Sequence, residues 1–484
     1  MRIRVWVSAA VAVVVCMCGI ATANAQSTGN VTGSLVTLVN SGQYQFNRLE
    51  RLSAIGNQTT YNQLVGTCGN LLAASAACPA EMFRVFQISQ ELVQSANELL
   101  GAGPTQFSLR VDDQGLGFAL RWTAAEELSA PGSASTEFAN TQIASVMSRI
   151  TAIRFGGGDA QAQVTARGAR GGSAGDDSVS MPASRWGVFL DGGFGYGKRH
   201  PTELEDAFAF DDRSFTLGVD YRVTPRLVLG AMLGSNNQRI DFDSSQSVVS
   251  GNLRASGAGL TLYGLYEWEG PYLDMALGYQ RLAIDSRREI NYPSFNINVE
   301  SVNALATGTT HSTNTIGTIS FGWPLNMRAV SVDPYLNMEY RDITINGFRE
   351  NSIYTGGTRN GMPSGYGFAF GDQHLSSMDG AIGIKLQYTW TPHVGVFIPY
   401  IKGELHHNFD TDPFTVDATY NDQYAGGTPF ELPSDKRVST YRIYAGGISA
   451  VLPHGWQMFG QYQATSGISY LGHHVISAGI RGEF

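Results

Sequence analysis

The last stretch of the chain, 473-HHVISAGIRGEF-484, alternates between two kinds of side chain. The apolar or small register is His474, Ile476, Ala478, Ile480, Gly482 and Phe484, and the mostly polar register is Val475, Ser477, Gly479, Arg481 and Glu483. A period of two predicts a β-strand with two different faces. A closed transmembrane barrel needs such a strand at its end, because its last strand must pair with its first and leave no edge in lipid.

The composition also favours a barrel. The chain has 484 residues, too many for one compact core, so we expect at least two structural units. Charged residues make up only 15%, and there are 57 Gly, 24 Phe, 21 Tyr and 7 Trp. Few charges with much glycine and many aromatics are typical of strands between lipid and a narrow lumen. The net charge of −9 argues against nucleic acid as a partner, because nucleic acid needs a basic surface.

The first 25 residues have the pattern of a secretory signal peptide. Arg2 and Arg4 precede an apolar run over residues 5–20, and Ala23-Asn24-Ala25 forms a cleavage site. The apolar run is short for a spanning helix, and no later stretch is long and apolar enough, so the sequence excludes a helical membrane protein. We therefore expect an exported chain that begins at Gln26.

Cleavage after Ala25 would leave two cysteines, Cys68 and Cys78. In an exported protein we expect this pair to form a disulfide. A metal or redox site is the alternative, but the two cysteines do not form a Cys-x-x-Cys motif, and the nearest histidine is His200.

Residues 26–134 are expected to form a small, mainly helical domain. Three segments, 31–55, 58–76 and 81–101, are expected to be helices, and in the third apolar residues such as Met82, Val85 and Phe86 recur at helical spacing. Residues 106–122 alternate loosely, and we interpret them as a short hairpin around Asp112-Asp113-Gln114-Gly115.

No catalytic or cofactor motif is found. The chain has no G-x-S-x-G elbow, no P-loop and no H-E-x-x-H, so we expect neither an enzyme nor a cofactor. The pairs His406-His407 and His473-His474 could bind a metal. Neighbours on a strand point to opposite faces, however, so each pair offers one ligand per face, and we expect no metal site.

Residues 135–184 are expected to be a helix followed by a flexible linker. Ile143, Val146, Ile150 and Ile153 form one stripe of a helix from about Phe138 to Arg154, and residues 156–184 are mostly Gly, Ala, Ser and Asp. Two placements of the helix are open. It enters the barrel lumen, where Arg149 and Arg154 meet acids such as Asp220, Asp274 or Glu404, or its stripe packs on the N-terminal domain.

Residues 185–484 are expected to form the barrel. Twelve alternating segments lie near 185–197, 213–223, 226–239, 256–269, 271–285, 311–324, 329–346, 375–391, 393–408, 437–452, 455–465 and 473–484. Tight breaks follow the even segments and longer, polar loops follow the odd ones. Bacterial barrels alternate in this way, with short turns in the periplasm and long loops outside. The predicted fold class is thus an all-β transmembrane barrel of 12 antiparallel strands, preceded by a small, mainly α domain.

The alternation also separates lipid-facing from lumen-facing residues. Ile382, Ile384 and Leu386 share one register, and Gly383 and Lys385 share the other. By the same reasoning we expect four charged residues in particular to face the lumen: Asp220, Asp274, Lys385 and Glu404.

Residues 185–484 resemble the translocator domain of the autotransporters of type V secretion. The resemblance rests on the strand series and on three blocks, 227-LVLGAMLG-234, 334-PYLNMEY-340 and 399-PYIK-402. It implies a bacterial outer-membrane location, contact with lipid and with the barrel-assembly machinery, and export of an N-terminal passenger. The terminal Phe484 resembles the signal by which this machinery recognises barrels. The region before the barrel departs from the family pattern, because it is short, mainly helical and without the repeats of a large β-helical passenger.

Three functions remain open. The first is an autotransporter-type barrel that anchors, and could translocate, the N-terminal domain, which would then meet an unidentified extracellular ligand. The second is an outer-membrane pore with a periplasmic helical domain. The third is an outer-membrane enzyme that uses the loops or the N-terminal domain.

Overall fold

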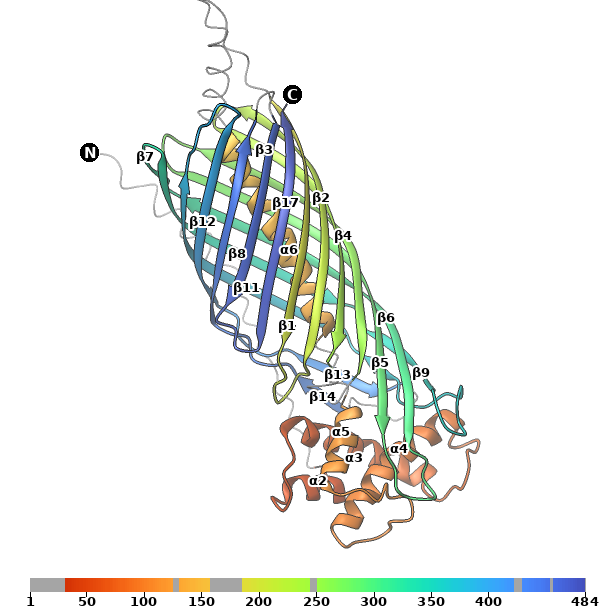
Figure 1. Cartoon of the computed structure of the whole chain (residues 1–484). Helices are drawn as coiled ribbons and strands as arrows, with labels where there is room; N and C mark the ends of the chain where they lie inside the picture. Colours follow the sequence, from red (N-terminus) through yellow and green to blue (C-terminus); the bar gives the residue numbers. More distant parts are fainter. Residues whose placement is uncertain are drawn as a thin grey trace, which may run out of the picture. The chain divides into compact units, whose positions relative to one another are not determined.

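Twelve long antiparallel strands close into a barrel in the computed structural model of the chain (Figure 1). The structure describes residues 31–124, 130–156, 185–243, 250–421, 429–452 and 456–483. The barrel strands are β1 Trp186–Arg199, β2 Phe208–Thr224, β3 Leu227–Phe242, β4 Ser250–Glu267, β5 Tyr272–Tyr292, β6 Val302–Gly322, β8 Val330–Ile345, β11 Gln373–Tyr388, β12 Val396–Asn408, β15 Thr440–Val451, β16 Trp456–Ser466 and β17 Leu471–Glu483. Each expected strand is present.

The C-terminal strand closes the barrel. β17 pairs with β1 from Gly187↔Glu483 to Arg199↔Leu471, and also with β16. The pairing leaves no free edge between the first and last strands, as the alternation of residues 473–484 predicts. Phe484 itself, the expected signal peptide at 1–25 and most of the expected linker, residues 157–184, lie outside the described residues.

The two ends of the barrel differ in their connections. We call the end with the short connections, such as that between β2 and β3, the turn end, and the opposite end the loop end. At the turn end the short strand β7, Leu325–Met327, pairs with β8. At the loop end β9 Phe348–Tyr354, β10 Phe368–Phe370, β13 Thr415–Tyr420 and β14 Phe430–Pro433 pair in series and join β6 through β9.

Strands β5 and β6 are longer than the sequence suggested. Residues 286–310 were expected to form a polar loop, but Ser286 pairs with Gly308, and the ladder continues to Tyr292↔Val302. The outward-facing residues of this segment are mostly polar. The apolar–polar alternation that predicts a strand therefore ends at residue 285. The extra length carries the sheet beyond the barrel at the loop end.

Within residues 31–124 the structure has four helices: α2 Ser34–Asn40, α3 Arg48–Cys68, α4 Ala80–Leu99 and α5 Asp113–Trp122. The expected helix over 31–55 is divided, because Asn47 and Glu50 form a capping box that begins α3. The expected hairpin at 106–122 is wrong. The Asp112 side chain accepts a hydrogen bond from the Gly115 N–H and caps α5, so the acidic pair begins a helix rather than a turn. We call residues 33–124 the helical domain.

Helix α6, Ala130–Gly156, lies inside the barrel (Figure 1). It begins earlier than the expected start near 138. Its stripe residues Val146, Ile150 and Ile153 pack on barrel residues such as Phe189 and Met232, which lie on β1 and β3. The alternative placement, on the N-terminal helices, is therefore wrong.

The described residues from Gly33 onward form one compact unit. Within the described ranges, no helix combines the length and the apolar character that crossing a membrane would require.

Candidate functional site

The barrel lumen holds α6 against an apolar wall on one side. Val146, Ile150 and Ile153 form a core with side chains of β1, β3, β4 and β5, which are Phe189, Val228, Met232, Tyr263, Leu265, Tyr272 and Ala276. Nearer the loop end, Phe138 packs with Phe208 and Phe210 of β2. These contacts bury the apolar stripe of α6 along most of its length.

A buried charge group lies where α6 meets β2 and β17. Arg149 of α6 forms an ion pair with Asp220 of β2, and Nη2 of Arg481 lies 3.1 Å from the other carboxylate oxygen of Asp220. Arg149 also stacks over the Phe189 ring at 4.6 Å. All three charged residues are less than 5% exposed, so one carboxylate compensates two guanidinium groups away from water.

A second charge group fixes the last turn of α6. Arg154 Nη1 lies 2.9 Å from Asp333 Oδ2, and the guanidinium group stacks over Tyr272 at 3.3 Å. Lys385 Nζ lies 3.6 Å from the same Asp333 oxygen, and Tyr272 donates a hydrogen bond to it. Sequence reasoning named Lys385 but missed Asp333, which lies directly opposite Lys385 in the pairing of β8 with β11.

Helix α6 also borders a cavity of about 300 Å³, whose lining is a mixture of polar and apolar side chains. Its lining includes Asp274, Lys385 and Glu404, three of the four residues that the sequence assigned to the lumen. Glu404 accepts a hydrogen bond from Tyr335 at 2.7 Å and pairs with Lys402 at 3.1 Å. The fourth residue, Asp220, lies in the Arg149 group.

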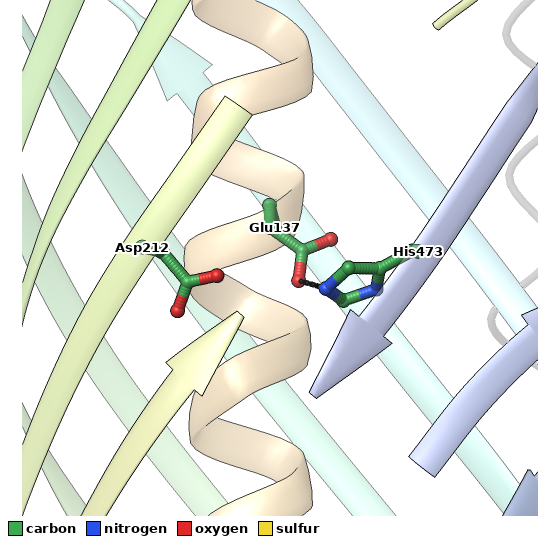
Figure 2. A group of neighbouring side chains, drawn as sticks. All are labelled: Glu137, Asp212 and His473. Carbon is green, nitrogen blue, oxygen red and sulfur yellow. Dashed lines mark ion pairs between the residues drawn. The ribbon is translucent and has the colours of Figure 1, made fainter. Parts of the chain in front are cut away.

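The two histidine pairs split between the faces, as expected for neighbours on a strand. His473 is buried toward the lumen, whereas His474 lies on the outer surface between Tyr196 and Tyr462. His473 comes close to Glu137 of α6 and Asp212 of β2 (Figure 2). Sequence reasoning missed this group, because its members come from three elements that no local pattern connects.

The helical domain packs on the loop end of the barrel. One continuous core joins residues of α2–α5, including Leu38, Phe86 and Leu120, to the loop-end strands and their connections. The barrel side contributes Ile290, Tyr292, Val299, Val302, Ala304, Ala306, Phe348, Tyr354, Tyr366, Phe368, Phe370, Val416, Ala418, Tyr420, Phe430 and Leu432. The helical domain is thus a cap, with its core shared with the barrel loops.

Polar contacts fix the register of this cap. Tyr420 of β13 donates a hydrogen bond of 2.9 Å to Asn57 Oδ1 on α3, and both residues are buried. Asn296, in the β5–β6 connection, donates to the carbonyl oxygens of Gln106 and Ser108. Arg121 of α5 pairs with Asp206 at 2.7 Å.

Cys68 and Cys78 form a disulfide with a Cα–Cα distance of 5.6 Å. Cys68 is the last residue of α3, and Cys78 precedes the start of α4 at Ala80. The bond, which the sequence predicts, joins the end of α3 to the segment before α4, and both cysteines are buried.

Comparisons with known proteins place the barrel among the autotransporters. Residues 188–463 match the family model of the autotransporter beta-domain. The translocator domain of autotransporter NalP from Neisseria meningitidis is 14% identical, with 67% of this chain and 96% of that chain covered and a TM-score of 0.45. The beta domain of the Bordetella autotransporter BrkA is 13% identical, with coverages of 62% and 100% and a TM-score of 0.42.

The transport unit of the autotransporter AIDA-I from Escherichia coli is also similar. It is 14% identical, with coverages of 67% and 98% and a TM-score of 0.37. No curated protein matches the chain.

Proposed function

The chain belongs to the autotransporter β-domain family and is a barrel of the bacterial outer membrane, and from this premise we propose that it displays its own helical domain on the cell surface. The barrel would carry the chain before β1 across the membrane and then keep it as a permanent cap. No released passenger is part of this proposal.

The observation that carries the proposal is the course of α6 through the lumen. The N-terminal part of α6 lies with Phe208 and Phe210 near the loop end, and Arg154 lies with Glu267 and Asp333 at the turn end, where β1 also begins. Short turns of bacterial barrels face the periplasm. The proposal therefore puts the helical domain, which packs on the loop end, outside the cell, and an exported chain would reach that position by crossing the membrane.

The shared core supports anchoring rather than release. Separating the helical domain from the loops would expose large apolar side chains on both partners, including Phe86, Tyr420 and Phe430. Each such side chain contributes about 1.5–3 kcal/mol when fully buried. The proposed role is structural display, without catalysis, and assembly would use Phe484 and the barrel-assembly machinery.

The pore interpretation has less support. α6 occupies the lumen and is held there by ion pairs to Asp220 and Asp333. A cavity of about 300 Å³ lies beside α6, and its walls carry charges of both signs. A periplasmic helical domain would also require the long loops to lie on the periplasmic side of the membrane.

Cysteine labelling in intact cells tests the display proposal. Gln45→Cys lies at an exposed position of the helical domain, and Asn326→Cys lies at an exposed position of the turn end. We expect a membrane-impermeant maleimide to label Gln45→Cys in intact cells. Asn326→Cys should react only after the outer membrane is permeabilised.

The reverse pattern would contradict the proposal and favour a periplasmic helical domain. Labelling of both positions only after permeabilisation would do the same. Heat-modifiable mobility on gels confirms that each variant contains a folded barrel, and the native cysteines do not react because they are joined in the disulfide.

A further inference from the structure

Three side chains from separate elements meet at the lumenal wall (Figure 2). They are Glu137 of α6, Asp212 of β2 and His473 of β17, and one potential ligand atom of each lies within 4.8 Å of the others. The residues are 8%, 1% and 7% exposed, respectively. They are therefore a buried set of one imidazole and two carboxylates.

The first barrel strand makes this meeting possible. β1 lies between β2 and β17, and its register places Gly195 opposite Asp212 and Gly197 opposite His473. A Cβ atom on Gly195 would lie 1.9 Å from Asp212 Oδ1. The missing side chains of β1 thus let the Asp212 carboxylate lie across the strand toward β17. Providing space for the Asp212 carboxylate is thus a specific structural role of the glycine-rich stretch at residues 193–197.

Each of the three side chains carries an atom without a hydrogen-bond partner among the described residues. These atoms are Glu137 Oε1, Asp212 Oδ1 and His473 Nε2, and all three are buried. Glu137 Oε1 and His473 Nε2 are 3.0 Å apart but are not oriented to form a hydrogen bond. A separation of about 3 Å is that of two neighbouring ligands on one ion with metal–ligand bonds of about 2.0–2.2 Å.

The charges of the group also require compensation. Two carboxylates share this small buried volume, and a like charge nearby disfavours the ionised form of each. Arg341, which is within electrostatic reach of Glu137, already pairs with Glu339 and Asp379. A divalent cation between the three ligands would balance both carboxylates.

We propose that Glu137, Asp212 and His473 bind a divalent transition-metal ion of the Zn²⁺ class. One imidazole nitrogen with two carboxylate oxygens suits such an ion, whereas Ca²⁺ and Mg²⁺ prefer oxygen ligands alone. Glu137 and His473 line the cavity beside α6, which gives the site access for the ion and for a water molecule as a further ligand.

The position of the site gives the ion a structural role. Its ligands come together only when α6 is inside the barrel and β1 is paired with both β2 and β17. A bound ion would therefore join the lumenal helix to the closing strands after assembly. Because the ion binds the assembled state alone, it stabilises that state by mass action.

Zn²⁺ binding to the purified full-length protein tests the proposal. The protein, without a histidine tag, is folded in detergent, treated with EDTA and titrated with zinc chloride by calorimetry. We expect one Zn²⁺ per chain and a higher unfolding temperature with Zn²⁺ than with EDTA. His473→Ala, Glu137→Gln and Asp212→Asn should each lose this binding. His474→Ala, the neighbouring residue on the outer surface, is the matched control and should retain it.

Stability measured in EDTA, without metal, distinguishes a variant that has lost the metal site from one that is misfolded. Glu137→Gln removes one of two neighbouring carboxylates, so in EDTA it should be as stable as the unchanged protein or more stable. The proposal is overturned if the unchanged protein binds no Zn²⁺, or if folded Glu137→Gln and Asp212→Asn still bind it with one site per chain. Should His473→Ala fail to fold, these two variants decide the result.

Discussion

The helical domain and helix α6 are both attached to the barrel, but by different kinds of contact. The helical domain shares an apolar core with the loop-end strands, in which Phe86, Phe368 and Phe430 are almost fully buried. α6 combines an apolar stripe with buried ion pairs, such as Arg149 with Asp220.

This contrast indicates which changes each attachment tolerates. A shared apolar core depends on shape and buried area, so it should respond to steric changes and little to charge. A buried ion pair depends on its partner, because removing one member leaves the other charged and poorly solvated. The lumen should therefore be sensitive to single charge deletions and the cap to single changes of volume.

The largest effect is expected for Asp220→Ala in the lumen. It removes the carboxylate between Arg149 and Arg481, and breaking a buried ion pair costs about 3–5 kcal/mol. The transition from compact to unfolded barrel, measured by heat-modifiable mobility, should move to a clearly lower temperature. Asp241→Ala is the control, because Asp241 pairs with Arg239 on the exposed surface and such pairs contribute at most about 1 kcal/mol. Equal shifts in the two variants would argue against a charge-dependent lumen.

The disulfide should stabilise only the helical domain. Replacing Cys68 and Cys78 by serine opens a loop with a sequence separation of 10, which costs about 2–3 kcal/mol. Helical ellipticity should melt at a lower temperature, while the heat-modifiable mobility of the barrel stays unchanged. An unchanged helical transition in the double variant would show that the bond does not stabilise the domain.

A steric change should detach the cap. A Cβ atom on Gly56 of α3 would lie 2.3 Å from the Phe430 ring of β14, so Gly56→Leu must displace that ring from the shared core. Overpacking of this kind costs about 1–3 kcal/mol. We expect faster proteolysis of residues 33–124 on intact cells, with the barrel still folded.

The same substitution elsewhere on α3 is the matched control. A Cβ atom on Gly66 would meet no atom of another described element within 4 Å, so Gly66→Leu extends into open space. Replacing glycine within a helix stabilises it by about 0.5–1 kcal/mol. Similar proteolysis of both leucine variants would contradict a cap that depends on shape at Phe430.

The smallest effect is a pH dependence of the cap. Burial raises the pKa of Glu91 on α4 from 4.5 to about 8, although the positive charge of Arg359 opposes the shift. The folded state therefore holds this proton more tightly than the unfolded state does. Its contribution to stability is complete below pH 4.5 and is lost as the pH rises to about 8.

Helical melting at pH 5 and pH 8.5 measures this dependence. Glu91→Gln should reduce the difference between the two melting temperatures, because the amide does not titrate. Glu81→Gln changes an exposed glutamate of the same helix and should leave the difference intact. A pH response that is the same in all three proteins would exclude Glu91 as its source.

Local pattern was sufficient for the barrel. A strand shows its two faces through a period of two, so Ile382 and Lys385 could be assigned to opposite sides from a few residues of sequence. The structure has Ile382 67% exposed and Lys385 4% exposed. The order of short and long connections supported a barrel in the same way, because each connection is recognised from a few neighbouring residues.

Prediction from local pattern failed where the same polar residues are compatible with two kinds of secondary structure. The acidic pair at Asp112 and Asp113 suits a turn as well as a helix start, and only the bond from Gly115 to Asp112 decides between them. The polar ends of β5 and β6 lack a lipid-facing register, so pairing between distant residues alone identifies them as strands.

Sequence alone was enough to predict a closed barrel, its two registers, an exported chain and a pair of cysteines available for a disulfide. Three-dimensional packing was needed to show that α6 lies in the lumen, that the helical domain shares a core with the loops, and that Glu137, Asp212 and His473 meet. The physical reason is the range of the contacts. Periodicity follows from the geometry of neighbouring residues, whereas the partner of Arg149, Asn57 or His473 depends on how elements far apart in the chain pack together.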